Sequence, residues 1–350
     1  MGRRSNGGSL RFQRFALKLL CTVLGLILAA MILLTLYFHH LMSRIHYVEP
    51  EDHFTLSQEE LEEFLSAETV SPDAGTPTMD PESVDFGNAD VEIGVDRSEV
   101  INILLIGQDR RPGEARARSD SMILCTFNKD TKTLTLTSIL RDLYVQIPGY
   151  QDNRVNVAYA AGGMKLLNET LEKNFGIRVD GNVEVDFTQF ADIVDLVGGV
   201  QIELRADEAN LINRAQGSSL TEGTNLLTGD QALQYARIRS LDSDGDFSRT
   251  NRQRKVVGAI VDAYKNASLK TLLSLLDDIL PMITTDMSNL QIISYALDLF
   301  PLLSDVRIVS QRIPADGTYS GQMIRGMAVL VADMDAARAL LEETLLGNTD

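Results

Sequence analysis

Histidine is nearly absent from the sequence, and its four copies all lie within the first 53 residues, at His39, His40, His46 and His53. A Ser-His-Asp triad, a Cys-His pair or a histidine-ligated zinc site therefore cannot be built from residues 54–350. The only two cysteines, at positions 21 and 125, exclude a disulfide framework. Chemistry in the C-terminal part must use carboxylates, arginine, hydroxyl groups or a hard metal ion.

The net charge of -17 is spread unevenly along the 350 residues. Residues 1–44 carry six basic side chains and no acidic one, whereas residues 45–99 hold sixteen acids and a single arginine. Residues 100–350 have 25 basic and 33 acidic side chains. The acidic balance therefore describes mainly residues 45–99 and says little about the ligand of the folded part.

An uncharged run over residues 19–38 (LLCTVLGLILAAMILLTLYF) is long enough to span a hydrocarbon core of about 30 Å as a helix. We predict a transmembrane helix over residues 19–40; a cleavable signal peptide is the alternative, but its apolar region would be shorter. Basic residues precede the run, so we expect a cytoplasmic tail over residues 1–18 and an extracellular chain after residue 40. They are Arg3, Arg4, Arg11, Arg14 and Lys18.

Residues 41–99 are acidic and contain four prolines, which predicts a solvated extracellular stem. From residue 100 onward, patterns typical of strands and helices alternate. Residues 100–107, 121–128 and 131–140 are predicted strands, and residues 328–346 are a predicted helix. We therefore expect one α/β domain over residues 100–350, with a mixed central β-sheet and helices on both faces (α-β-α).

Arginine makes up 24 of the 32 basic residues. Its planar guanidinium suits bidentate contacts with phosphate or carboxylate oxygens, although local ion pairs would explain the bias as well. Asp109 ends the first predicted strand and Asp120 begins the second, so both carboxylates are expected at one edge of the sheet. Two carboxylates can hold a magnesium-like cation, or they can simply pair with Arg111 and Arg118.

A second set of candidates lies between residues 237 and 253. Arg237 and Arg239 share a side only if the chain is extended there, so a helix should end near residue 235. Arg249 and Gln253 are four residues apart and share a face near a helix N-terminus, which favours anions. Acidic residues lie between the two arginine groups, at Asp242, Asp244 and Asp246. They do not match a calcium loop, because its sixth position is Phe247 and its twelfth is Gln253.

Six ordered blocks make the sequence resemble the LytR-CpsA-Psr family of cell-envelope glycopolymer phosphotransferases, also called the cell envelope-related transcriptional attenuator domain. The blocks are residues 102–111 (NILLIGQDRR), 118–120 (RSD), 138–142 (SILRD), 154–163 (RVNVAYAAGG), 186–200 (DFTQFADIVDLVGGV) and 227–254 (LTGDQALQYARIRSLDSDGDFSRTNRQR). One departure is Leu140, where the family commonly has proline before its Arg-Asp pair.

The resemblance implies that an undecaprenyl pyrophosphate-linked glycopolymer, a teichoic acid or capsule chain, is transferred to a peptidoglycan sugar hydroxyl at the outer face of the membrane. Asp109 and Asp120 would hold Mg²⁺ or Mn²⁺. The side chains implied to bind pyrophosphate are Arg118, Arg141, Arg237, Arg239, Arg249 and Gln253, with Arg111 behind them. Arg141 would also act in catalysis together with Asp109 and Asp120, and the whole enzyme would be a single-pass membrane protein of a Gram-positive type bacterium.

Three further assignments depend on position in the sequence. Asp244 or Asp246 is our hypothesis for the proton acceptor, because both lie between the arginines. An apolar stretch with helical spacing would line a slot for the isoprenoid, although such residues are also typical of an ordinary core. Its members are Phe187, Phe190, Ile193 and Val194. Cys125 is interpreted as a buried strand residue.

Two other functions compete with transfer. The same residues would serve a polyprenyl pyrophosphate hydrolase, in which water replaces the sugar hydroxyl. A non-enzymatic envelope regulator, or transcriptional attenuator, is the other alternative. Nucleic acid is not an expected partner, because the folded part is net acidic and predicted to lie outside the cell. The expected partners are the lipid-linked polymer, peptidoglycan and the membrane, and the sequence sets no expectation for the oligomeric state.

Overall fold

The computed structural model describes residues 31–32, 35–37, 39–40, 42–48, 55–61, 76–87, 97–108, 119–242 and 245–347. They belong to two compact units, Met1–Ile45 and His46–Asp350, of which the second holds the domain. Most of the transmembrane helix predicted over residues 19–40 lies outside the described residues. No helix in the described ranges is both long enough and apolar enough to cross a membrane.

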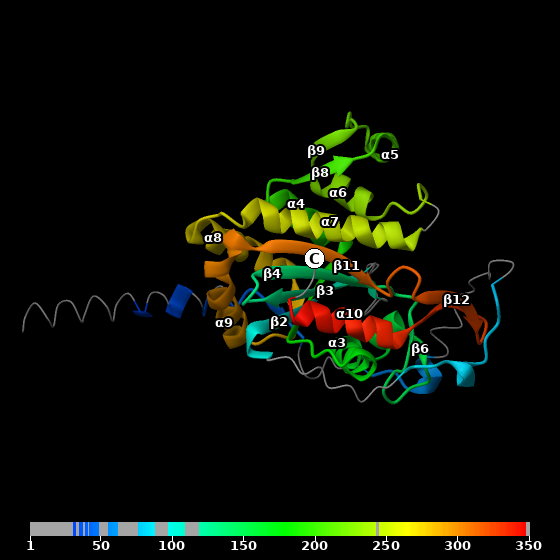
Figure 1. Ribbon diagram of the computed structural model, residues 1–350. Coiled ribbons are helices and arrows are strands. Elements are labelled where there is room, and N and C mark those ends of the chain that lie inside the picture. Colours follow the sequence, from blue (N-terminus) through cyan, green and yellow to red (C-terminus); the bar gives the residue numbers. More distant parts are fainter. Residues whose placement is uncertain are drawn as a thin grey trace, which may run out of the picture. The chain divides into compact units, whose positions relative to one another are not determined.

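A seven-stranded mixed sheet organises the described part of the second unit (Figure 1). Its order is β1-β10-β7-β2-β3-β4-β11, with β7 parallel to β2, β4 parallel to β11, and β2, β3 and β4 antiparallel in succession. The strands are β1 (His46–Tyr47), β2 (Val100–Gln108), β3 (Ser119–Asn128), β4 (Thr133–Ile139), β7 (Gly181–Asp186), β10 (Thr284–Thr285) and β11 (Arg307–Ile313). The predicted mixed α/β class is confirmed.

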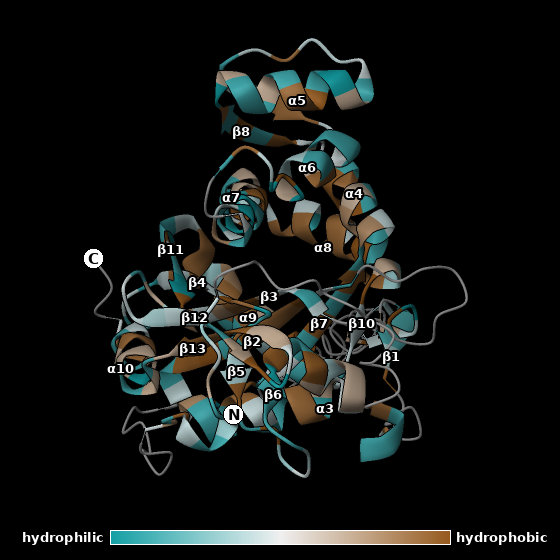
Figure 2. Ribbon diagram, turned by 90° about the vertical axis from the view of Figure 1, so that its right-hand side faces the viewer, coloured by the Kyte–Doolittle hydropathy of each residue, from teal (hydrophilic) through white to brown (hydrophobic). Residues whose placement is uncertain are grey.

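Helices cover both faces of this sheet, as Figures 1 and 2 show. On one face lie α3 (Val155–Phe175) and α10 (Met334–Leu345); on the other lie α4 (Phe187–Leu196), α6 (Gly229–Ala236), α7 (Asp246–Tyr264) and α8 (Leu269–Ile279). Alternate residues of the central strands pack against α3 and α10 in the main core, among them Leu104, Ile106, Met122 and Leu124. A further helix, α9 (Asn289–Leu299), follows β10.

Residues 187–264, which we call the outer module, have a hydrophobic core of their own. Within it, β8 (Val200–Leu204) pairs antiparallel with β9 (Gly223–Leu227), and α5 (Ala206–Gln216) connects the two strands. Its fully buried side chains include Val194, Ile212 and Tyr235. Figure 2 shows α5 and β8 as a layer beyond α4, α6 and α7. Neither α5 nor β9 was predicted from the sequence.

The predicted helix over residues 328–346 is wrong in its first part. The chain instead forms β13 (Met327–Ala332), which pairs antiparallel with β12 (Tyr319–Ile324), and α10 begins only at Met334. Gly326 turns the hairpin with a φ of 75°, which favours glycine. β-branched Val329 and Val331 then suit a strand, and Asp333 caps the helix by accepting from Ala336 N at 2.9 Å.

Parts of the expected stem are packed onto the domain, which corrects the interpretation of a solvated segment. Residues 46–47 form strand β1 at the sheet edge. The backbone N–H of Leu56 donates to Ala161 O at 2.9 Å, and Leu61 is buried in the main core. Phe86 stacks on Tyr144 of the short hairpin β5 (Tyr144–Val145) and β6 (Asn153–Arg154). These apolar side chains outweigh the acidic composition that surrounds them.

Cys125 on β3 has a free thiol; the residue as a whole is half-buried, and desolvation of its sulfur raises the pKa of the thiol to about 12. At pH 8 only about 10⁻⁴ of such a thiol is thiolate, so we expect alkylation about 10³-fold slower than for an ordinary cysteine. The measurement is iodoacetamide labelling followed by mass spectrometry on a Cys21→Ser variant, with the urea-unfolded chain as the fast control. Comparable labelling rates in the folded and unfolded protein would contradict the burial of this thiol.

Candidate functional site

The site begins where strands β3 and β4 meet at one edge of the sheet. Asp120 is the second residue of β3, and Arg141 follows the end of β4. Because the two strands are antiparallel neighbours, the start of β3 lies beside the end of β4. Arg141 Nη1 donates to Asp120 Oδ1 at 2.7 Å. Two residues far apart in the predicted motif thus form one charge-assisted pair.

The N-terminus of α7 supplies the next part of the site. Its N-cap is Gly245 with a φ of 48°, and Asp246 is the first helical residue. Asp246 Oδ2 accepts from Arg141 Nε at 3.1 Å and from Arg249 Nη2 at 3.3 Å. Arg249 Nη2 also reaches Asp120 O at 3.3 Å. Asp246 therefore joins the arginine of the sheet edge to the arginine of the helix.

The segment between α6 and α7 adds two more guanidinium groups. Helix α6 ends at Ala236, which confirms the predicted end near residue 235. Arg239 Nε lies 3.2 Å from Asp246 Oδ1. The Arg237 guanidinium lies 4.6 Å from the ring centroid of Phe187, at the start of α4. Arg239 therefore reaches the N-terminus of α7, whereas Arg237 lies against the start of α4.

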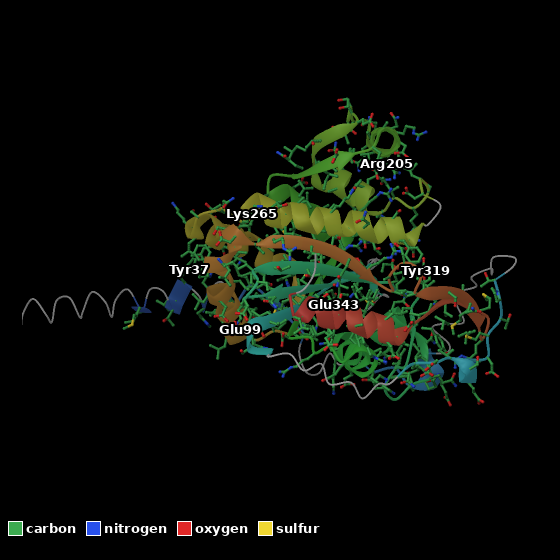
Figure 3. All side chains as sticks on the ribbon, in the orientation of Figure 1. Tyr37, Glu99, Arg205, Lys265, Tyr319 and Glu343 are labelled. Carbon is green, nitrogen blue, oxygen red and sulfur yellow. The ribbon has the colours of Figure 1, made fainter. Side chains whose placement is uncertain are left out.

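A cavity of about 250 Å³ opens beside these charges. Its polar lining includes Asp120, Ser121, Arg141, Asp142, Asp246 and Arg249. Apolar lining comes from Phe247 and from the hairpin residues Val329 and Leu330. Phe247 also stacks on Tyr319 of β12 with 4.9 Å between ring centroids, and Figure 3 labels Tyr319 at that end of the sheet. Gln253 Oε1 accepts from Ser121 Oγ at 3.0 Å.

Burial and neighbouring charges act differently on the two central arginines. Burial opposes the charge of Arg141, yet Asp142, Asp246 and Asp120 together hold its pKa above the ordinary value. Burial lowers the pKa of Arg249 to about 10; Asp246 opposes this shift, whereas Arg239 and Arg141 add to it. Arg249 Nε is buried with no hydrogen-bond partner among the described residues. The site is thus incompletely neutralised and suited to an anion.

The structure places the predicted residues as follows. Asp109, Arg111, Arg118 and Asp244 lie outside the described residues. Ion pairs bring together Asp120, Arg141, Arg239, Asp246 and Arg249. On α4, Phe187 and Ile193 are half-buried, whereas Val194, with Phe190 packed against it, belongs to the core of the outer module.

Two contributors were not predicted from the sequence. Asp142 lines the cavity and lies 3.6 Å from Arg141 and 3.5 Å from Arg154. Its position directly after Arg141 was the only available signal. Phe247 lines the cavity from the first turn of α7. In the sequence it is marked only as the residue that breaks the match to a calcium loop.

Oxygen donors in this cavity fit a hard cation. Asp120 is partly exposed and lines the cavity, and its carboxylate is the ligand type that Mg²⁺ prefers. Over the residues whose placement is known, no group of three or more His, Cys, Asp or Glu side chains forms a metal site. A metal held here would take its other ligands from beyond those residues, from a bound phosphate or from water.

Comparison with known proteins finds relatives that are similar in sequence and in structure. One relative is the polyisoprenyl-teichoic acid–peptidoglycan teichoic acid transferase TagU of Bacillus mycoides (strain KBAB4), 39% identical over 181 residues, which are 51% of this chain. The match spans 57% of the length of that relative. The crystal structure of B. subtilis TagT aligns with a TM-score of 0.57 and 27% identity, covering 80% of this chain and 99% of TagT.

A second solved structure is the LytR-CPS2A-psr family protein YwtF (TagT) with bound octaprenyl pyrophosphate lipid. It aligns with a TM-score of 0.55 and 27% identity, covering 80% of this chain and 99% of that protein. The model of the LytR_cpsA_psr family matches residues 66–345, which is most of the sequence. The chain therefore belongs to the LytR-CpsA-Psr (LytR_cpsA_psr) family.

Proposed function

We propose that the protein transfers an anionic glycopolymer, as a teichoic acid or capsule chain, from an undecaprenyl pyrophosphate carrier to a peptidoglycan sugar hydroxyl. The main support is the arginine cluster around Asp246, because Arg141 and Arg249 line one small cavity and Arg239 pairs with the same carboxylate. Relatives named for teichoic acid transfer, and a relative with a bound prenyl pyrophosphate, agree with this chemistry.

The arginines would act on the diphosphate. Phosphoryl transfer needs positioning and charge stabilisation more than covalent chemistry from the protein. We assign Arg141, Arg239 and Arg249 to the phosphate oxygens, because the same carboxylate of Asp246 holds all three in place. Further contacts are assigned to Arg118, Arg237 and Gln253, with Arg111 behind them.

Asp246 is better suited to positioning these arginines than to accepting a proton. Both of its oxygens are engaged, Oδ1 by Arg239 and Oδ2 by Arg141 and Arg249. A general base needs a free lone pair directed at the attacking hydroxyl. The proton acceptor is therefore assigned to Asp244, two residues earlier in the chain.

A divalent cation completes the proposal. Asp109 and Asp120 would hold Mg²⁺ or Mn²⁺, which supplies charge neutralisation on the diphosphate when bound. Arg141 holds Asp120 at 2.7 Å, so the arginine also fixes the direction of that carboxylate. The protein's own contribution is thus a preorganised frame of charges around the diphosphate, whose P–O–P bond breaks so that polyprenyl monophosphate leaves.

The isoprenoid is assigned to the apolar side of the arginine cluster. Phe187 touches Arg237, so α4 carries apolar surface directly beside a phosphate-binding candidate. Phe187 and Ile193 would contact the lipid, while Phe190 and Val194 support them from the core of the outer module. Such a donor lies in the membrane, and the anchor predicted over residues 19–40 would keep the enzyme at the outer face of the cell membrane.

The test is transfer by the full-length protein in detergent, with a polyprenyl pyrophosphate-linked polymer as donor and peptidoglycan oligomers as acceptor. We expect an acceptor-linked product that is lost on addition of EDTA and restored by Mg²⁺. Release of polymer phosphate at the same rate without acceptor would identify a hydrolase and overturn the proposal. Unchanged transfer in EDTA would overturn the role of the metal alone.

A further inference from the structure

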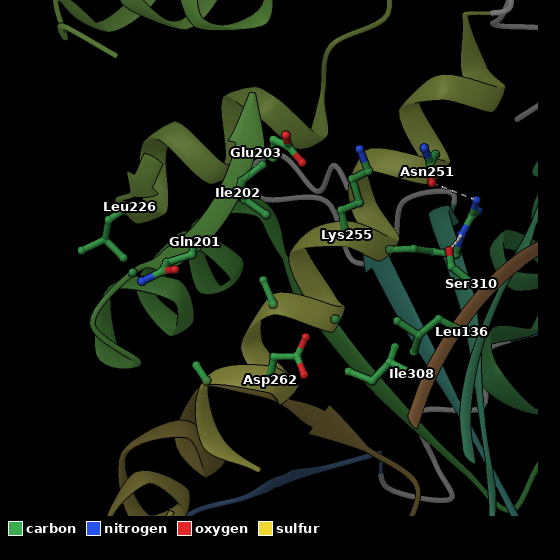
Figure 4. Close-up of a pocket in the computed structure, with 15 residues that line it drawn as sticks. Leu136, Gln201, Ile202, Glu203, Leu226, Asn251, Lys255, Asp262, Ile308 and Ser310 are labelled. Atoms are coloured by element: carbon green, nitrogen blue, oxygen red, sulfur yellow. Dashed lines mark hydrogen bonds between the residues drawn. The ribbon is translucent and has the colours of Figure 1, made fainter. Parts of the chain in front are cut away.

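A second cavity, of about 860 Å³, lies along α7 and shares no lining residue with the first (Figure 4). One face of α7 lines it with Asn251, Arg254, Lys255 and Gly258, and strands β8 and β11 contribute Gln201, Glu203 and Ser310. Its volume is in the range of cavities that hold small ligands or single polymer units. Amides, a hydroxyl, a lysine, a buried arginine and the carboxylates of Glu203 and Asp262 give it a polar lining with charges of both signs.

Arg254 is a buried cation that contacts no carboxylate among the described residues. Only 5% of its surface is exposed. Its Nε donates to Ser310 Oγ at 2.6 Å, Nη2 has a long contact of 3.5 Å to Asn251 Oδ1, and Nη1 has no partner. Burial lowers the pKa of Arg254 to about 10, and the charge of Arg312 acts in the same direction.

The other buried arginines of the described chain differ from Arg254 in this respect. Arg249, Arg252 and Arg338 each lie within 3.3 Å of a carboxylate oxygen. Leaving a guanidinium buried without an anion costs free energy that folding alone does not recover. A bound oxyanion would supply the missing charge and the missing acceptor for Arg254.

Helix α7 lines both cavities. Phe247 lines the first cavity and Arg254 lines the second, seven residues or about 10 Å further along the helix. Arg312 of β11 stacks on Phe247 with 4.4 Å between its guanidinium and the ring centroid. A ligand that is extended, with its diphosphate in the first cavity, has the length to reach Arg254.

Gly258 independently supports the interpretation that the second cavity holds a ligand. It lies inside α7, where glycine is unfavourable, and it lines the second cavity. An added Cβ would meet Ile308 and Leu136 only at 3.8 Å, so close packing does not require glycine there. A side chain longer than alanine would occupy the cavity itself, and the glycine therefore keeps that space open.

Asp262 lies away from the side chains that contact the buried guanidinium. Asp262 is separated from Asn251 and Ser310 in Figure 4, and its Oδ1 accepts from Lys265 Nζ at 2.8 Å. Carboxylates and amides are common partners of sugar and polyol hydroxyl groups. The cavity thus combines one anion-binding end with several acceptors for hydroxyl groups.

We infer that this second cavity binds a sugar-phosphate or polyol-phosphate unit, with the phosphate oxygens on Arg254 and Lys255 and the hydroxyl groups on Gln201, Glu203 and Asn251. The inference rests on the proposed function in taking this unit from the polymer of the donor. The cavity would hold the polymer some units away from the diphosphate, so that chain length and phosphate content affect donor binding.

The experiment measures binding of an oligo(glycerol phosphate) of about ten units to the full-length protein by calorimetry. Octaprenyl pyrophosphate is added at saturation to block the first cavity. We expect Arg254→Gln to weaken binding about 10- to 100-fold, as loss of one or two hydrogen bonds to a charged group predicts. Gly258→Leu should independently weaken binding to a similar degree, because its side chain would fill the space of the ligand. Arg214→Gln, which alters an exposed arginine of α5, is the matched control and should bind as the parent does.

Several outcomes would overturn the inference. One is equal oligomer binding in the parent and in both folded variants, with melting curves showing that each variant folds. Another is an equal loss of octaprenyl pyrophosphate binding in Arg254→Gln, which would place Arg254 in the first cavity. A change confined to the KM of the peptidoglycan acceptor would assign the cavity to the acceptor instead. If the lipid fails to bind while the oligomer still does, the proposed function fails and the second cavity stands.

Discussion

Arg141→Ala is expected to lower the rate of polymer transfer by about 10²- to 10³-fold, the loss typical of removing one preorganised charge contact. Arg141 contacts two carboxylates at 2.7 and 3.1 Å, so its loss also leaves Asp120 and Asp246 less well placed. The measurement is the initial transfer rate at saturating donor, together with kcat/KM. We expect kcat to fall with kcat/KM, since the interaction is strongest in the transition state.

Two variants make this result interpretable. Arg141→Lys keeps the charge but loses the planar guanidinium group that contacts both carboxylates. The activity of this variant should therefore lie between those of the parent and Arg141→Ala. Arg214→Ala, which alters an exposed arginine that lines neither cavity, should transfer within about threefold of the parent. Transfer by folded Arg141→Ala at more than about a third of the parent rate would remove Arg141 from the site.

Arg252→Ala is expected to destabilise the protein by about 3–5 kcal/mol, because it leaves a buried carboxylate without its partner. Arg252 Nε donates to Glu208 Oε1 at 2.8 Å, and both side chains are less than 10% exposed. Arg252 also pairs with Asp242 and donates from Nη1 to Ile238 O at 3.2 Å. The free energy of unfolding, measured by urea denaturation of the full chain, reports the effect.

The matched control removes both members of the buried pair. In Arg252→Met combined with Glu208→Leu no charge is left unpaired at this position, and Asp242 keeps Arg205 at 2.7 Å. We expect this double variant to be clearly more stable than Arg252→Ala alone. A loss below about 1 kcal/mol in Arg252→Ala would show that water reaches Glu208 and that the pair contributes little.

The sequence predicted much of the sheet, because apolar runs of strand length carry a strong signal. The predicted strands at residues 100–107 and 121–128 differ from β2 and β3 by no more than two residues at either end. Helix α5 was missed because its apolar positions are few and its charged face is long. The residues of strand β13 were predicted as the start of a helix, because nearly every residue of this stretch is apolar and the alternation typical of a strand is missing.

The candidate site was predicted in pieces and not as an arrangement. The four-residue spacing of Arg249 and Gln253 and the end of α6 are local features, and the structure agrees with both. The meeting of Arg141 with Asp246 joins residues 105 positions apart, which no local pattern contains. The place of Asp142 in the cavity lining likewise depends on the tertiary structure. The roles of all these residues in catalysis stay predictions.

The two hydrophobic cores have a mechanical consequence. Asp120 and Arg141 are carried by the sheet, whose core faces α3 and α10, whereas Arg239 and Arg249 are carried by segments packed around the separate core of residues 187–264. An anion bound from both sides would link the two cores, in addition to the packing of α7 against β3, β4 and β11. Ligand binding would therefore raise the temperature at which both parts unfold, and release of the spent carrier would reverse that gain.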